Sequence, residues 1–107
     1  MDLVIRNGTI VMAGEISQAD MGIEAGKVKQ IGQGLGPAAK EIDATGKYLF
    51  PGGVDVHTHV DFELLGNRSI DDFYSGTAAA ACGGVTTIVD YALPEPDQSI
   101  HGSVEAW

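Results

Sequence analysis

The sequence contains little cysteine, few basic residues and no long apolar run. A single Cys among 107 residues cannot form an internal disulfide, which excludes a disulfide-stabilised scaffold and fits a reducing compartment. The sequence has 6 Lys and Arg and 15 Asp and Glu, for a net charge of -9. So negative a surface repels nucleic-acid phosphates and anionic lipids. The longest apolar run, Ala78 to Cys82, falls far short of the ~18 residues of a membrane span.

The composition is otherwise that of a globular protein. The apolar fraction of 44% excludes a disordered tail, and the 15 glycines predict many tight turns. The N-terminus lacks the apolar stretch of a signal peptide. We therefore expect a cytoplasmic protein that binds neither nucleic acid nor membranes.

Residues 1–52 are expected to form a β-rich region. Short β-prone segments alternate with turn signals, and no helical pattern of any length precedes Pro51. The pair Asn7-Gly8 suits a type I′ turn, so it predicts a hairpin between strands at 3–5 and 9–12. The glycine-rich stretch 32–36 resembles a phosphate loop, but no helix pattern follows it, so we interpret it as a flexible turn. This spacing of strands favours a piece of an antiparallel sandwich or barrel.

Residues 53–107 follow a strand–helix–strand pattern. Val54–Val60 is predicted to be a strand, and the Ala-rich run Phe73–Cys82 a helix. The pattern [ST]-x-x-[DE] at Ser69–Asp72 predicts a capping box, and two glycines end the helix. The β-branched run Val85–Tyr91 predicts a buried strand. The two strands of such a unit pair in parallel.

The last apolar face is unfinished. Ile100, Val104 and Trp107 fall at i, i+4 and i+7, on one side of a helix that stops at the last of them. Two parallel strands cannot close a barrel, and a (β/α)8 barrel takes about 250 residues. We therefore expect the N-terminal part of a longer protein. An independent, inactive small β domain is the alternative, which that unfinished face disfavours.

The strongest chemical signal is the heptapeptide DVHTHVD. Because side chains alternate along a strand, Asp55, His57, His59 and Asp61 are predicted to share one face. Two imidazoles about 6.6 Å apart along a strand can converge at its end on one metal ion, at ~2.0–2.1 Å each. The pair alone is equally typical of a polar surface strand. Its place after Pro-Gly-Gly, and before a helix and a second strand, favours the metal site.

Residues after this pair are candidate substrate contacts. Phe62 and Leu64 offer apolar surface on a loop that either lines a pocket or folds back onto the strands. Asp61 adds a charge beside them. Asp90 falls near the end of the second strand, where barrel enzymes keep their sites. It is either a supporting group or a loop-start residue, and we favour the loop-start interpretation.

These strings resemble a known family. PGGVDVHTH at 51–59 resembles the first metal-binding strand of the cyclic amidohydrolases, and within them the dihydropyrimidinase/hydantoinase group. The likeness continues through DDFYSGT at 71–77 and AAACGGVTT at 79–87. It extends to LVIRNG at 3–8 and IDATGKY at 42–48, so it covers nearly the whole chain.

The resemblance implies an α/β fold, with a (β/α)8 barrel beside a small β-sandwich. Residues 1–52 would be the N-terminal share of that sandwich, and residues 53–107 the first βαβ unit of an incomplete barrel. The family holds two divalent metals, commonly zinc, bridged by a carboxylated lysine and a hydroxide. Carried over, His57 and His59 bind one of these metals. The lysine, the other ligands and the catalytic residues would lie beyond Trp107, so these 107 residues alone are expected to be inactive.

The implied activity of the full-length protein is hydrolytic ring opening of hydantoins or dihydropyrimidines to N-carbamoyl amino acids, in a homo-oligomer such as a tetramer. Dihydroorotases carry Arg two residues after the second His, where this sequence has Asp61, which repels an anionic substrate. A neutral cyclic ureide that contacts Asp61, Phe62 and Leu64 is therefore expected. Allantoinase or dihydroorotase activity stays open as an alternative. Another alternative is a non-catalytic binding or scaffold relative, against which the two retained histidines argue.

Overall fold

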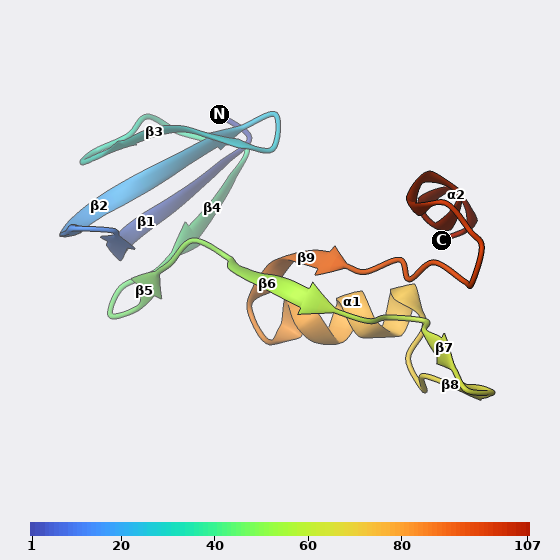
Figure 1. Ribbon diagram of the computed structural model, residues 1–107. Coiled ribbons are helices and arrows are strands. Elements are labelled where there is room, and N and C mark those ends of the chain that lie inside the picture. The colour runs from blue at the N-terminus through green and yellow to red at the C-terminus, as the bar shows by residue number, and fades with distance from the viewer. The chain divides into compact units, whose positions relative to one another are not determined.

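The computed structural model describes residues 1–107 and divides into two compact units, Met1–Pro51 and Gly52–Trp107. Each unit is described by itself. The chain is mixed α/β and rich in strands, with nine strands and two helices (Figure 1).

The first unit is a five-stranded sheet built around its first strand. The spatial order is β3-β2-β1-β4, and β5 also pairs with β1. β1 is antiparallel to β2 and parallel to β4 and β5. The strands are β1 (Leu3–Met12), β2 (Glu15–Glu24), β3 (Lys27–Gly32), β4 (Lys40–Asp43) and β5 (Tyr48–Leu49).

The hairpin predicted at Asn7-Gly8 is wrong. β1 runs through that pair, and the turn lies at Ala13-Gly14 instead. The pairing with β2 shifts by one residue there, so that Arg6 and Asn7 together oppose Asp20 in a β-bulge. Asn7 has a φ of 61°, in the left-handed region that Asn tolerates. The dipeptide does signal a positive φ, but the chain uses it for a bulge and not for a turn.

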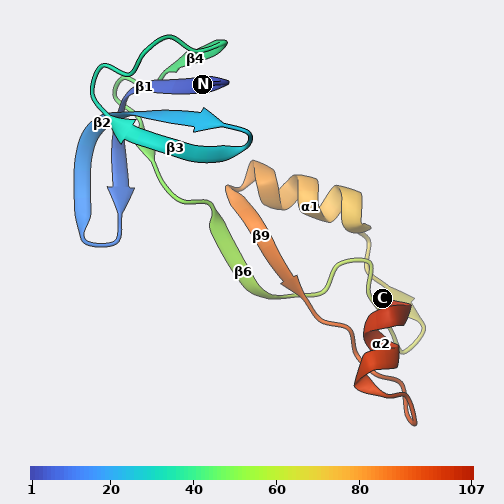
Figure 2. The same ribbon diagram turned by 90° about the horizontal axis from the view of Figure 1, so that it is seen from above.

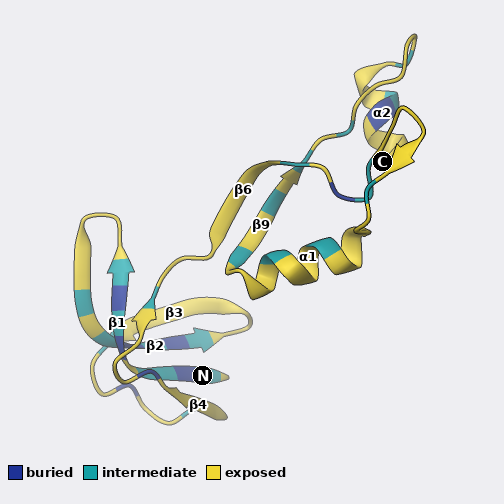
Figure 3. Ribbon diagram, turned by 90° about the horizontal axis from the view of Figure 1, so that it is seen from below, coloured by how far each residue is buried: buried dark blue, intermediate teal, exposed yellow.

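A small core lies under β1. Val4 is fully buried, and Ile10, Leu35 and Ala44 are also buried. Figure 3 shows dark, buried segments in β1 and β2, whereas the outer strands β3 and β4 are largely exposed. After the bulge, the buried positions Gly8 and Ile10 alternate with half-buried or exposed ones, as expected for one face of a strand.

The second unit contains the predicted strand–helix–strand pattern. β6 (Gly53–Thr58) and β9 (Val85–Asp90) pair in parallel, which confirms that prediction. The helix α1 (Phe73–Cys82) has the predicted bounds and lies beside the strand pair (Figures 1 and 2). Two further elements complete the unit: the hairpin of β7 (Glu63–Leu64) and β8 (Asn67–Arg68), and the helix α2 (Ile100–Ala106).

The capping box of α1 starts at Asp72, three residues after Ser69, where the sequence pattern predicted it. Asp72 is the N-cap, and its side chain accepts a hydrogen bond from the Ser75 N–H at 2.8 Å. The Asp72 N–H in turn donates to Ser75 Oγ. Ser69 is not part of the box. The helix ends at Gly83, and Gly84 then takes a φ of 84°, in the left-handed region.

Much apolar surface of the second unit is exposed. Val54 and Val56 on β6 are 58% and 67% exposed, and Ile100 on α2 is 79% exposed (Figure 3). Exposed apolar side chains of this kind are typical of surfaces that contact other groups. Neither helix has the combination of length and apolar character that a membrane crossing requires.

Candidate metal and substrate site

The two histidines of the heptapeptide converge. His57 is in β6, and His59 follows directly after its end. Their Nε2 atoms lie 3.2 Å apart. Two nitrogens that bind one tetrahedral ion at ~2.0–2.1 Å each are about 3.3–3.4 Å apart, so the observed separation fits a shared ion. The same separation suits an N–H···N hydrogen bond when one ring donates.

The two carboxylates predicted on the same face do not join the imidazoles. Asp55 Oδ1 accepts a hydrogen bond from the His57 backbone N–H at 3.1 Å. The strand ends at Thr58, and Asp61 has a left-handed φ of 53°, so the alternation stops before that residue. No group of three or more His, Cys, Asp or Glu side chains comes together in residues 1–107. The chain therefore supplies two metal-ligand candidates and not four.

Aromatic rings hold each imidazole from one side. The Tyr91 ring stacks on His57, with centroids 4.4 Å apart and planes 23° apart. Phe62 packs against His59 at a centroid distance of 4.7 Å. Phe62 was a candidate from the sequence, whereas Tyr91 was missed. A signal was available, because Tyr91 directly follows the strand that pairs with β6 in parallel.

The three predicted substrate contacts line one groove. Asp61, Phe62 and Leu64 face a cavity of about 430 Å³, together with Leu93 and Trp107 among others. A volume of this size accommodates a small organic ligand. The groove combines apolar side chains with charged groups from the β7–β8 hairpin.

An ion pair closes the base of that hairpin. Arg68 donates from Nε and Nη2 to Asp61 Oδ1, at 2.8 and 2.6 Å. This hydrogen bonding to the Asp61 carboxylate raises the pKa of Arg68. Phe62 and Ser69 also exchange hydrogen bonds, from the Phe62 N–H to Ser69 Oγ and from the Ser69 N–H to the Phe62 carbonyl. The guanidinium offsets the Asp61 charge, so the repulsion of an anion is weaker than the sequence alone suggests.

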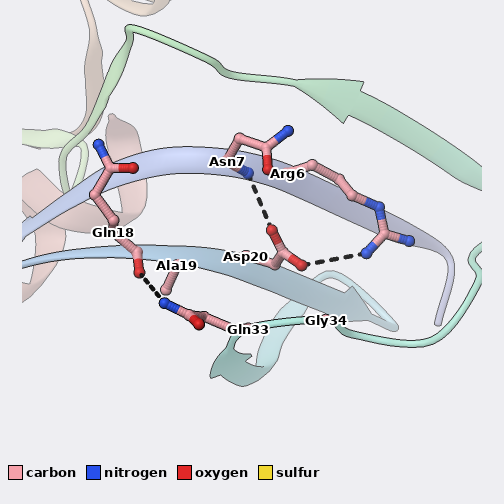
Figure 4. A pocket seen from close by; sticks show the side chains of 7 residues that line it. All are labelled: Arg6, Asn7, Gln18, Ala19, Asp20, Gln33 and Gly34. Carbon is pink, nitrogen blue, oxygen red and sulfur yellow. Dashed lines mark hydrogen bonds and ion pairs between the residues drawn. The ribbon is translucent and has the colours of Figure 1, made fainter.

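A second pocket, of about 360 Å³, lies in the first unit, and its polar side chains bind other groups of the same sheet (Figure 4). Its buried Asp20 accepts hydrogen bonds from the backbone N–H groups of Asn7 and Leu35 and from Arg6. The Asn7 bond is the main cause of a lowered Asp20 pKa. Arg6 also binds Glu41 and the Leu35 carbonyl. Every charge here has an internal partner, and none is free for a ligand. No helix follows the glycine-rich stretch, in agreement with its interpretation as a turn.

The chain is similar to known proteins over its whole length, although the similarity is to individual proteins. No family model matches it. The D-hydantoinase of Ralstonia pickettii is 53% identical over 107 residues, which are 100% of this chain and 23% of that protein. The D-hydantoinase of Geobacillus stearothermophilus is 48% identical over 108 residues, with the same coverage. The chain thus spans less than a quarter of the length of these relatives.

Solved structures give the same result. A D-hydantoinase structure matches with a TM-score of 0.95 and 53% identity, over 100% of this chain and 23% of that one. The N-acyl-D-glutamate deacylase of Bordetella bronchiseptica, solved with zinc and a phosphonate inhibitor, matches with a TM-score of 0.67 and 28% identity. That match covers 92% of this chain and 21% of that one.

The fold, the relatives and the strand with two converging histidines together fit the cyclic amidohydrolase family. Within that family, residues 1–107 correspond to the N-terminal portion of the hydantoinase group.

Proposed function

We propose that the full-length protein is a metal-dependent hydantoinase, which opens cyclic ureides by hydrolysis to N-carbamoyl amino acids. The observation that carries the proposal is the 3.2 Å separation of the His57 and His59 Nε2 atoms at the end of β6. The 53% identity to a D-hydantoinase over the whole chain supports it. The alternatives, an allantoinase, a dihydroorotase or a scaffold protein, lack comparable support.

His57 and His59 are the proposed ligands of one divalent metal ion. The chemistry that such an ion supplies when bound is activation of water as a nucleophile and polarisation of the attacked carbonyl. Tyr91 and Phe62 restrict the two imidazole rings by packing against them. The zinc in the deacylase structure of similar fold supports this assignment. A second ion and a bridging carboxylated lysine would involve residues outside this chain.

The groove beside the imidazoles is the proposed substrate contact region. Phe62 and Leu64 would pack against an apolar substituent on the ring, and Asp61 with its partner Arg68 would flank it. We further propose that Met1–Pro51 contributes to a β-sandwich and that β6, α1 and β9 begin a (β/α)8 barrel. We also propose that the full-length protein forms a homo-oligomer and is located in the cytoplasm.

Metal content and turnover test the ligand assignment directly. His57→Ala or His59→Ala in the full-length protein should lower the bound metal, measured by inductively coupled plasma mass spectrometry, and abolish hydantoin opening. The matched control is His101→Ala, since His101 is the third histidine and lies exposed on α2 beside Glu105. The control should keep both properties. Unchanged metal stoichiometry and activity in His57→Ala would refute the assignment.

A further inference from the structure

We propose that Asp90 is a positioning residue, which fixes the histidine segment and the Trp107 wall of the groove relative to each other. The inference rests on the proposed metal function. It reverses the interpretation of Asp90 as a simple loop-start residue, because both of its carboxylate oxygens accept hydrogen bonds from groups distant in sequence.

The first bond extends the parallel pairing beyond the strand. The backbone pairing of β6 with β9 ends at Thr58 and Asp90, and the Tyr91 N–H donates to the Thr58 carbonyl at 3.3 Å. Asp90 Oδ1 then accepts from the Val60 N–H at 3.2 Å. Beyond the end of the paired strands, the Asp90 carboxylate thus accepts the Val60 N–H in the way that a backbone carbonyl of β9 would. His59 therefore lies between two residues that β9 holds, Thr58 and Val60.

The second bond reaches the groove. Asp90 Oδ2 accepts from the Trp107 indole Nε1–H at 2.9 Å. The Trp107 ring lies 5.9 Å from Phe62, and Phe62 in turn packs on His59. Both Phe62 and Trp107 line the groove. One carboxylate therefore ties the backbone beside a proposed metal ligand to a wall of the proposed substrate region.

The two hydrogen bonds require two acceptor oxygens on the side chain of residue 90. Asn has one acceptor oxygen and an NH2 group, so in Asp90→Asn one of the two N–H donors meets another donor. This variant keeps nearly the same volume. Trp107→Phe removes the indole N–H while it leaves an aromatic ring, so of the two Asp90 hydrogen bonds it breaks only the one to Oδ2. Together the variants separate the two halves of the proposal.

The test uses the full-length protein and has readouts other than activity. Cobalt-substituted wild type and Asp90→Asn are compared by ligand-field absorption and by metal affinity in chelator competition. We expect Asp90→Asn to change the absorption and to lower the affinity about 10-fold, as loss of outer supporting groups does. Trp107→Phe should raise the KM for a 5-substituted hydantoin several-fold and change kcat less. The control is Asp97→Asn, an exposed carboxylate in the loop between β9 and α2, which should match wild type.

The outcomes separate the two claims. If wild type binds no metal, the proposed function fails. If wild type binds metal and Asp90→Asn keeps both affinity and spectrum, the positioning role is overturned. Should Asp90→Asn misfold, as judged by circular dichroism, the metal affinity of Asp90→Glu, which displaces both acceptor oxygens, tests the histidine half, and unchanged affinity overturns it; Trp107→Phe tests the link to the groove. An unchanged KM in that variant overturns the link to the groove.

Discussion

Gly76 in α1 lies where the helix approaches the segment after the histidines, and alanine there should be harmful. A Cβ at Gly76 would lie 2.8 Å from Val60 Cγ1. Ordinary contact begins at 3.4 Å, so one of the two must move by about 0.6 Å. Val60 cannot easily yield, since it is buried, β-branched and bonded to Asp90. Movement of Val60 would also displace His59, its neighbour in sequence.

Two opposing terms set the magnitude for Gly76→Ala. Replacing glycine by alanine inside a helix gains about 1 kcal/mol, whereas overpacking a tight contact costs about 1–3 kcal/mol. We expect a net loss of about 0–2 kcal/mol, together with weaker metal retention. The assay is thermal melting of the full-length protein, with metal content measured after dialysis.

The matched control is Gly102→Ala, which places the same change in the other helix. There a Cβ would meet the polar side chains of Ser99 and Gln98, at 3.2 and 3.5 Å. Gln98 can adjust, and Ser99 Oγ, which accepts a hydrogen bond from the Gly102 N–H, needs to move by only about 0.2 Å, so the change should lie within about 1 kcal/mol of neutral. If Gly76→Ala raised the melting temperature as much as Gly102→Ala and kept its metal, the close-contact argument would be wrong.

Four further predictions concern the substrate, the hairpin, pH and the isolated chain. Hydantoins or dihydrouracil should be opened with a higher kcat/KM than dihydroorotate, and the reverse order would contradict the substrate class. Arg68→Gln should loosen the hairpin held at Asp61 and raise the KM for 5-substituted hydantoins several-fold, with Arg68→Lys intermediate; an unchanged KM would show that the ion pair is unimportant. Because hydrogen bonds lower the Asp20 pKa below its usual 3.8, the stability from its ionised form is complete above that value and is lost as the pH falls through the lower folded pKa. Urea midpoints measured from pH 6 to 3 should therefore decline less steeply in Asp20→Asn, and parallel profiles would argue against this role. Residues 1–107 alone should show no ring opening with added zinc or manganese and should self-associate in sedimentation; a compact monomer that melts cooperatively would contradict the latter.

The sequence predicted those features that depend on local chemistry. The bounds of α1 follow from an Ala-rich run that two glycines terminate, and the parallel pairing follows from the length of the connection. The convergence of His57 and His59 could be predicted because two residues spaced by one share a strand face. These features need no information about distant residues.

The features that were missed depend on pairing across the chain. Asn7-Gly8 fits a hairpin and a bulge equally well by propensity, and only the partners of β1 decide between them. The contacts of Asp90 and Tyr91 join segments about 30 residues apart in sequence. The left-handed φ of Asp61, which ends the alternation, accompanies its ion pair with Arg68. No local pattern encodes any of these.

The buried Asp20 opposite the β1 bulge also bears on how the sheet folds. In a hairpin of two ten-residue strands, an alignment displaced by one position brings each side chain to the opposite face. Such a misaligned hairpin would separate the Asp20 carboxylate from the Asn7 and Leu35 N–H groups that donate hydrogen bonds to it here. A buried charge without donors is strongly unfavourable. A misaligned β1–β2 pair is therefore destabilised in the assembled sheet, where this position is buried, and the carboxylate helps to select the observed alignment.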